Sequence, residues 1–171
     1  MEPKNEAAAL TPERIEKLKA HLENNAFAQI CGIKVAEMWY DYVKMTAEVR
    51  PELLNPLGRV HGGMLYTLAD CCSGLTARTD GRKYVTQNGS LNYLSNVAQG
   101  HLEAESRVIR RGRTVCVLDI AVRCPEENKL LAEGIFTMYA ICFLPLMFCK
   151  RQGRCCLFGF CWQLNTIMER A

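Results

Sequence analysis

A segment near the middle of the chain predicts a helix that is apolar on most of its circumference. It opens with Gly62-Gly63, carries apolar side chains through to Leu75, and ends near Gly81. Asp70 is the one carboxylate within residues 62–77. A helix that is apolar nearly all round is usually buried, so we expect the rest of the fold to surround this one.

The segments on both sides of this helix alternate between apolar and polar residues, as half-buried strands do. Two strands precede the helix, with a hairpin at Asp41-Tyr42, and four strands follow it. The six segments are residues 33–40, 43–50, 84–94, 101–110, 116–122 and 130–139. Turns are expected at Arg111-Gly112-Arg113 and at residues 125–129, and a bulge at Gly89.

Thr11-Pro12-Glu13 predicts the start of a further helix, with Thr as the cap, Pro in the first turn and Glu at the positive end of the helix dipole. An apolar stripe extends this helix over about residues 12–28, through Ile15, Leu18, Leu22 and Phe27. The order is then one helix, two strands, the buried helix and four strands. This order predicts an α+β fold in which an antiparallel sheet curls around one central helix.

The length of 171 residues fits a single domain, which we assign to residues 1–140. Residues 141–171 form a Cys-rich tail in which two apolar runs flank the basic sequence KRQGR. Each run is shorter than the ~20 residues that a membrane-spanning helix needs. Two interpretations stay open: an extra element packed on the body, or contact with a membrane surface through acylated cysteines beside the basic cluster.

The net charge of +3 comes entirely from the tail, which leaves residues 1–141 neutral. A neutral body is a poor partner for duplex nucleic acid, so we exclude that class of partner. The cysteines of the body form no C-x-x-C pair, and residues 1–9 lack the apolar run of a secretory signal. We therefore expect reduced thiols, a cytoplasmic location and no metal site.

The residues around the start of the central helix carry the candidate chemistry. Gly62-Gly63 would leave bare N–H groups at the positive end of the helix, which suits a developing oxyanion. A carboxylate at Asp70, in an apolar helix, needs either partners or a chemical role. Asn55 offers an amide on the approaching loop. Singly, each feature has a purely structural interpretation: close packing for the glycines, a backbone contact for His61, and a loop contact for Asp70.

The spacing of these residues, N-x(5)-HGG-x(6)-D, resembles the hot-dog-fold acyl-CoA thioesterases of the phenylacetate-degradation, or PaaI-like, group. The resemblance covers about residues 20–140. It continues through four further motifs, Tyr93-Leu94-Ser95, Gly100-x-Leu102, Gly112-Arg113-Thr114 and Leu131-Ala132-Glu133-Gly134. It implies hydrolysis of acyl-CoA to free acid and CoA, with no metal, cofactor or prosthetic group.

The resemblance also implies a role for each residue of the motif. The Gly62 N–H would polarise the thioester carbonyl, with Gly63 beside it contacting the substrate. Asp70 would be the nucleophile or the general base for water. Asn55 would hold the thioester or the attacking water, with His61 helping to position it. The Ser or Thr that the family often places near the carboxylate is Thr86 here.

Helix geometry adds a constraint on where these groups meet. Gly62 and Asp70 are eight residues apart, or ~12 Å along the axis of one helix. They cannot both contact one carbonyl carbon, so two subunits would have to share each site. The resemblance implies the same arrangement, in a homodimer or homotetramer with composite sites.

Other features leave alternatives open. Arg110, Arg111 and Arg113 would either meet the phosphates of CoA or form a solvated hairpin tip. Tyr66 would either line the acyl pocket or belong to the core. Two other functions compete with the thioesterase: an enoyl-thioester hydratase on the same fold, and a non-catalytic acyl-CoA-binding protein. The acyl group and the choice between dimer and tetramer are not fixed by the sequence.

Overall fold

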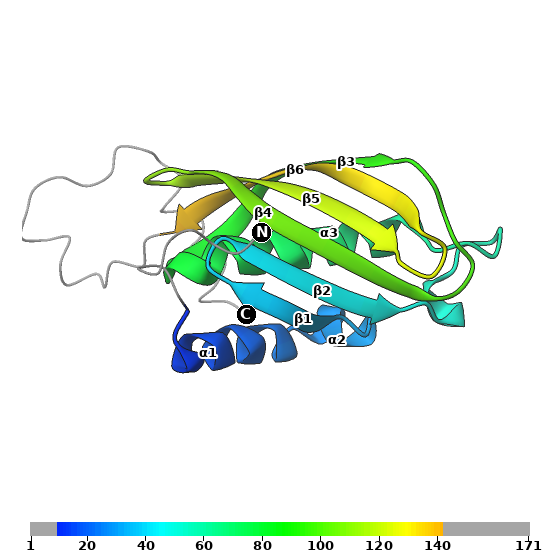
Figure 1. Cartoon of the computed structure of the whole chain (residues 1–171), viewed down its shortest axis with the longest axis horizontal. Coiled ribbons are helices and arrows are strands. Elements are labelled where there is room, and N and C mark those ends of the chain that lie inside the picture. The colour runs from blue at the N-terminus through cyan, green and yellow to red at the C-terminus, as the bar shows by residue number, and fades with distance from the viewer. Residues whose placement is uncertain (1–9, 142–171) are drawn as a thin grey trace, which may run out of the picture. The chain divides into compact units, whose positions relative to one another are not determined.

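The computed structural model of the protein describes residues 10–141. A six-stranded antiparallel sheet curls around the central helix α3 (Gly62–Ala77), as Figure 1 shows. The strands are β1 (Lys34–Trp39), β2 (Tyr42–Glu48), β3 (Lys83–Tyr93), β4 (His101–Arg111), β5 (Val115–Cys124) and β6 (Lys129–Ile141). Their order across the sheet is β1-β2-β4-β5-β6-β3, which leaves β1 and β3 at the edges. The predicted α+β architecture is confirmed.

Helix α3 contacts β2, β3, β4, β5 and β6 and forms the centre of the core. Its buried side chains include Leu65, Leu68 and Cys72. Their partners are the alternate residues of the strands, such as Met45 on β2 and Leu118 on β5. The burial predicted for α3 holds on this face. The opposite face is different, because Gly63 is exposed there.

Arg111 connects the end of α3 to the β1–β2 and β4–β5 hairpins, which lie far from it in the sequence. A short 3-10 turn (Arg78–Asp80) continues the helix to Gly81, which has a positive φ of 97°. The Arg111 guanidinium, at the end of β4, donates to Ala77 O at 2.8 Å and forms ion pairs with Asp80 at 2.7 Å and Asp41 at 2.6 Å. Asp41 lies in the β1–β2 turn with a φ of 63°. One arginine therefore joins α3, the β1–β2 turn and β4.

Two details of the predicted strands are wrong. The irregularity in β3 falls between Thr86 and Asn88, so the extra residue is Gln87 and Gly89 pairs regularly with Phe136. Gly89 serves a different purpose: a Cβ there would lie 2.4 Å from the Tyr66 hydroxyl oxygen. The last strand, β6, is longer than residues 130–139 and runs to Ile141, which pairs with Lys83.

The single helix predicted for residues 12–28 is also wrong, because it is two helices, α1 (Pro12–Glu23) and α2 (Ala26–Ile30). The Thr11 cap is confirmed, since its hydroxyl accepts from the Arg14 N–H. The break comes at Asn25, whose side chain accepts from the Ala28 N–H and starts a new helix. Phe27 then leaves the apolar stripe and is 60% exposed.

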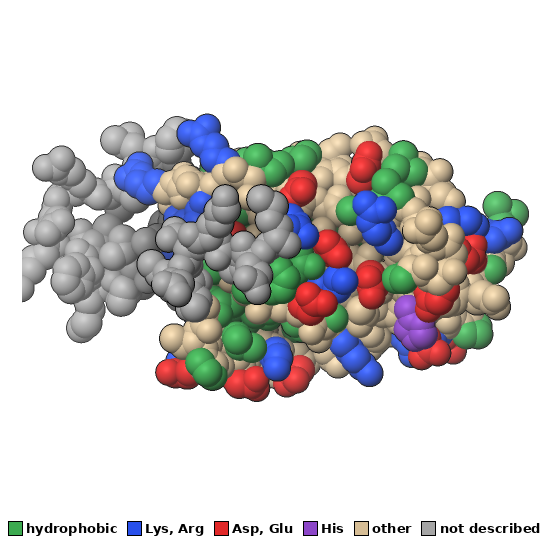
Figure 2. Space-filling view, in the orientation of Figure 1, with side chains coloured by type: hydrophobic (Ala, Val, Ile, Leu, Met, Phe, Trp, Pro, Cys, Tyr) green, Lys and Arg blue, Asp and Glu red, His purple; other side chains and the backbone are tan. Residues whose placement is uncertain are grey.

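Charges of both signs alternate on the face of the molecule seen in Figure 2. Lys44 on β2, for example, lies within 4 Å of Glu37, Glu103 and Glu105. Within residues 10–141 no helix is long and apolar enough to cross a membrane. The tail, with its predicted packing or membrane contact, lies outside the described residues, so the boundary after residue 140 stays a prediction.

Candidate active site

The first turn of α3 presents one N–H group without an acceptor. His61 is the N-cap, and its Nδ1 accepts from the Gly63 N–H at 2.9 Å. The Met64 N–H donates to His61 O, also at 2.9 Å. No acceptor among the described residues pairs with the Gly62 N–H. Of the two glycines, Gly62 therefore has the free donor at the positive end of the helix, whereas the N–H of Gly63 is already used.

The hydrogen bond from Gly63 also assigns the tautomer of His61. Because Nδ1 is the acceptor, a neutral ring carries its proton on Nε2. His61 is exposed, so this Nε2–H is a donor beside the helix start. His61 thus makes the backbone contact that its purely structural interpretation predicts, through Nδ1. Its Nε2–H remains as a second group that can donate to a ligand.

Asn55 shapes the loop that leads into α3. Its Oδ1 accepts from the N–H groups of Leu57 at 2.9 Å and Arg59 at 3.2 Å. The loop is closed by a bridge between Leu54 and Val60, and the His61 N–H donates to Leu53 O. Since the side-chain oxygen of Asn55 is used in the loop, the amide NH2 group is what it can offer to a ligand.

Asp70 lies two turns further along α3 and is held by β3. The Thr86 hydroxyl donates to Asp70 Oδ1 at 2.7 Å. Asp70 is half-buried, and this bond supplies the partner that a carboxylate in an apolar helix needs. Fixing one carboxylate oxygen orients the other. The structure thus brings together two residues that are sixteen positions apart and that the resemblance alone had paired.

Cys71, next to Asp70, is not a competing nucleophile. Burial, reinforced by the neighbouring charge of Asp70 and by Cys31, raises the pKa of the Cys71 thiol to about 11. The thiolate is the reactive form of cysteine, so at neutral pH this side chain stays protonated and inert. Asp70, by contrast, is held in position by its hydrogen bond from Thr86.

Tyr93 is a residue that the sequence had singled out only as part of a motif. Its hydroxyl donates to Gly62 O at 3.2 Å. Its ring lies so close to Gly62 that a Cβ at that position would be 3.4 Å from it. Tyr93 therefore fixes the first turn of α3 from the end of β3. In the sequence, only the motif Tyr93-Leu94-Ser95 drew attention to this residue, and no spacing rule predicted that it would contact Gly62.

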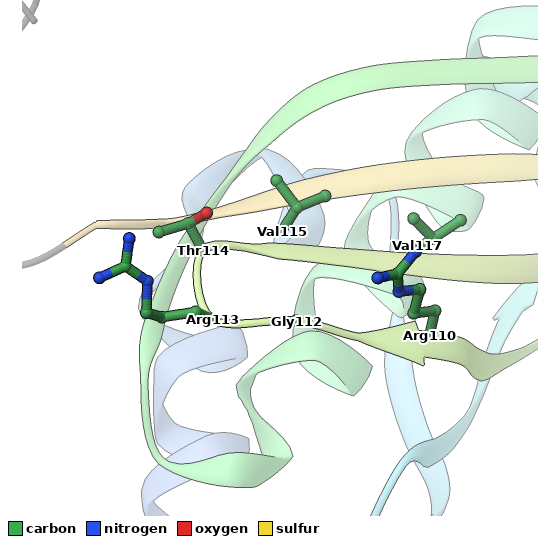
Figure 3. A pocket seen from close by; sticks show the side chains of 6 residues that line it. All are labelled: Arg110, Gly112, Arg113, Thr114, Val115 and Val117. Carbon is green, nitrogen blue, oxygen red and sulfur yellow. The ribbon is translucent and has the colours of Figure 1, made fainter.

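The three arginines of the β4–β5 hairpin divide into two groups. Arg111 is committed to Asp41 and Asp80, and its side chain is only 13% exposed. The prediction that Arg111 meets a phosphate is therefore not supported, because its donors serve the fold. Arg110 and Arg113 are exposed, and Figure 3 shows them at a shallow hollow on the hairpin, with Val115 and Val117.

These positions fall into two groups along α3. Asn55, His61 and Gly62 lie at its N-terminus, and Asp70 and Thr86 lie ~12 Å away along the helix. Within one chain the two groups do not converge. Within residues 10–141 no group of three or more His, Cys, Asp or Glu side chains is placed to hold a metal ion.

Comparison with known proteins identifies the family. The profile of the thioesterase superfamily matches residues 57–131. The solved structure of a hypothetical thioesterase with coenzyme A from Streptococcus pneumoniae is 32% identical, with a TM-score of 0.60 over 63% of this chain and 87% of that one. The chain belongs to the thioesterase superfamily.

Two further relatives place this thioesterase-superfamily chain within the PaaI-like group. The acyl-coenzyme A thioesterase PaaI of Escherichia coli is 29% identical over 114 residues, 66% of this chain and 81% of that protein. The structure of a thioesterase from Haemophilus influenzae is 26% identical, with a TM-score of 0.72 over 81% of this chain and 98% of that one. The predicted resemblance and the hot-dog fold are confirmed, and the protein is a hydrolase of thioester bonds.

Proposed function

We propose that the protein hydrolyses acyl-CoA, with Asp70 as the reacting carboxylate and the Gly62 N–H as the donor that polarises the thioester carbonyl. One observation carries the proposal: the unpaired N–H at the start of α3 and the oriented carboxylate of Asp70 lie on one central helix. The relatives support the substrate class, since the Streptococcus pneumoniae structure contains coenzyme A. The same pair of groups is what acyl transfer requires, a stabilised oxyanion and an activated nucleophile.

The reaction balances in either of two routes. Asp70 attacks the carbonyl carbon, or it takes a proton from a water that attacks. In both routes the carbon–sulfur bond breaks, and the CoA sulfur leaves and gains a proton. In the first route the acyl group is then held by Asp70 as an anhydride, which a water hydrolyses to give the free acid and restore the carboxylate. In the second route the attacking water supplies the new oxygen of the free acid, and Asp70 passes on the proton that it took. The negative charge on the carbonyl oxygen faces the Gly62 N–H, with the NH2 of Asn55 and the Nε2–H of His61 as further donors.

Two subunits are needed to assemble such a site. Gly62 and Asp70 of one chain are ~12 Å apart along α3, so the Gly62 of one subunit would face the Asp70 of its partner. Strand β3 supports this dimer, because it is eleven residues long and, within residues 10–141, pairs only with β6, so no described strand covers its other edge. A second copy pairing at that edge would bring the two α3 helices together around a two-fold axis.

Two other parts of the chain bear on the substrate and the compartment. Arg110 and Arg113, exposed at the hairpin hollow, would bind the phosphates of CoA. The five cysteines of the described residues are all free, which fits a reducing compartment such as the cytoplasm.

Release of free thiol from a panel of acyl-CoAs tests the proposal. We expect steady turnover by the full-length protein, and a loss of ~100-fold or more in Asp70→Asn, the scale of a lost general base. Asn keeps the shape of the side chain and its bond to Thr86, so circular dichroism should show an unchanged fold. Tight acyl-CoA binding without thiol release would indicate a binding protein. Hydration of an enoyl-CoA without thiol release would indicate a hydratase. Normal turnover in Asp70→Asn would remove that residue from the mechanism.

A further inference from the structure

Three residues of α3 face β3 in a regular row. Gly62 contacts Tyr93, Tyr66 contacts Gly89, and Asp70 contacts Thr86. The four-residue spacing places all three on one face of the helix. Tyr66 is therefore midway between the proposed carbonyl-polarising group and the proposed reacting carboxylate, ~6 Å along the axis from each.

The Tyr66 side chain spans the space between the helix and the sheet. Its hydroxyl donates to Gly89 O at 3.3 Å, on β3. Its ring packs against Phe136 of β6, with the ring centroids 5.3 Å apart and the planes tilted by 53°. Phe136 is completely buried. The space beneath this face of α3 is thus filled by two aromatic rings from opposite sides.

The strand is built to admit this tyrosine. Any side chain at position 89 would place its Cβ 2.4 Å from the Tyr66 hydroxyl oxygen and 2.5 Å from the Phe136 ring. Gly89 itself has no positive φ and pairs regularly with Phe136 in the sheet. The reason for a glycine here is therefore space for Tyr66, and not the conformation of the backbone.

Symmetry places Tyr66 between the two composite sites. If Gly62 of one subunit faces Asp70 of its partner across a two-fold axis, then the residue midway between them, Tyr66, lies nearest that axis. An acyl group that enters between α3 and the sheet from either site meets a Tyr66 ring within about one helical turn. A long acyl chain cannot occupy the same space.

We infer that Tyr66 is the specificity-determining side chain of this enzyme and restricts it to short acyl groups, of the size of acetyl to butyryl. The inference rests on the proposed thioesterase function. Tyr66 does not act on the thioester. It closes the space into which a longer acyl chain would extend, and its removal would open that space beside Asp70.

The test compares kcat/KM for acetyl-, butyryl-, hexanoyl- and decanoyl-CoA in the full-length protein and in a series at position 66. Wild type should lose ~10-fold or more from butyryl- to decanoyl-CoA, since one misfitting methylene already changes kcat/KM by about that factor. Tyr66→Ala should raise the decanoyl-to-butyryl ratio by ~10-fold or more. Tyr66→Phe keeps the ring and should leave the ratio unchanged. Tyr139→Ala, the same truncation at a 43% exposed position on β6, is the matched control.

Circular dichroism and gel filtration establish that each variant folds and assembles as wild type does. If the alanine variant does not fold, Tyr66→Leu leaves a smaller void and should shift the ratio in the same direction. Thiol release with an unchanged chain-length profile in the folded Ala or Leu variant overturns the role of Tyr66 and leaves the proposed function standing. A wild-type preference for decanoyl-CoA over butyryl-CoA also overturns the role of Tyr66 and leaves the proposed function standing. No thiol release from any substrate overturns the proposed function, and the inference with it.

Discussion

Single residues divide into those whose partners are near in sequence and those whose partners are far. The Thr11 cap was predicted from local spacing, and the sequence also offered a backbone contact for His61, which the structure shows as the N-cap of α3. The partners of Arg111 are 31 and 70 residues away, so no local pattern distinguished it from Arg110 and Arg113. The pairing of Asp70 with Thr86 was predicted from the family resemblance alone. A carboxylate in an apolar helix indicates that it needs a partner, but the pattern does not identify that partner.

Asp80 allows the Arg111 cluster to be tested by pH. Burial opposes ionisation of this carboxyl, but hydrogen bonds from Arg82 and Tyr84 and the charge of Arg111 outweigh it and lower the pKa of Asp80. A lowered folded-state pKa means stability that is present above the unfolded pKa, ~3.9 for Asp, and that is lost as the pH falls through the folded pKa.

We expect Asp80→Asn to lower the free energy of unfolding by about 2 kcal/mol at pH 7, the worth of hydrogen bonds to a charged group. The difference from wild type should begin to shrink below pH ~4, where the carboxyl of the unfolded wild type takes up a proton, and should keep shrinking as the pH falls through the lowered folded-state pKa of Asp80. Urea unfolding at several pH values measures both effects. Asp119→Asn, at an exposed position on β5, is the matched control and should change stability by less than about 0.5 kcal/mol. A constant difference from pH 7 to pH 3 would contradict the assigned role of the charge.

At the scale of elements, periodicity predicted the strands, which burial in the core determines. It missed the break between α1 and α2, which a local side-chain hydrogen bond determines. The period-two segments became six strands in the expected order, because burial on one face imposes that period. The break at Asn25 was missed, since the apolar stripe alone does not show that a side-chain cap will start a second helix. The bulge assigned to Gly89 was wrong for a related reason: a glycine in a strand signals either a bulge or a close approach, and only the position of Tyr66 decides between them.

Gly134 shows the same close-approach role at the pairing of β6 with β3. A Cβ at this position would lie 1.9 Å from Ser90 O and 2.9 Å from Leu91 Cα, and both are backbone atoms that no rotamer change can move. Gly134→Ala should therefore force the strands apart and lower the free energy of unfolding by about 3 kcal/mol. Glu133→Ala, at the adjacent exposed position, should change it by less than about 0.5 kcal/mol. Urea unfolding at one protein concentration compares the two variants, and equal stability in both would show that the strands accommodate the methyl group.

At the scale of the whole molecule, the residues of the proposed site form two groups at separate places along α3 of one chain. The sequence predicted this from the eight residues that separate Gly62 and Asp70, and the observed α3 runs as one helix through both positions. A second subunit would cover the incompletely buried face of α3 and the edge of β3 that no other described strand pairs with. Neither the edge nor the face was evident from periodicity, because strand order in a sheet depends on contacts between distant segments.

Mixing two inactive variants tests the shared site. Asp70→Asn removes the reacting carboxylate, and Asn55→Asp removes the amide NH2 while keeping the Oδ1 that accepts from Leu57 and Arg59. Each homodimer should be nearly inactive. Unfolding, equal mixing and refolding make half of the dimers mixed, and in each mixed dimer one site is intact while the other lacks both groups. Activity should return to about a quarter of wild type if the sites act independently. Refolded wild type, and each variant refolded alone, are the controls for recovery. If the two groups met within one chain, every site would lack one of them, so no recovery in a sample whose mixed dimers are verified by mass would refute the composite site.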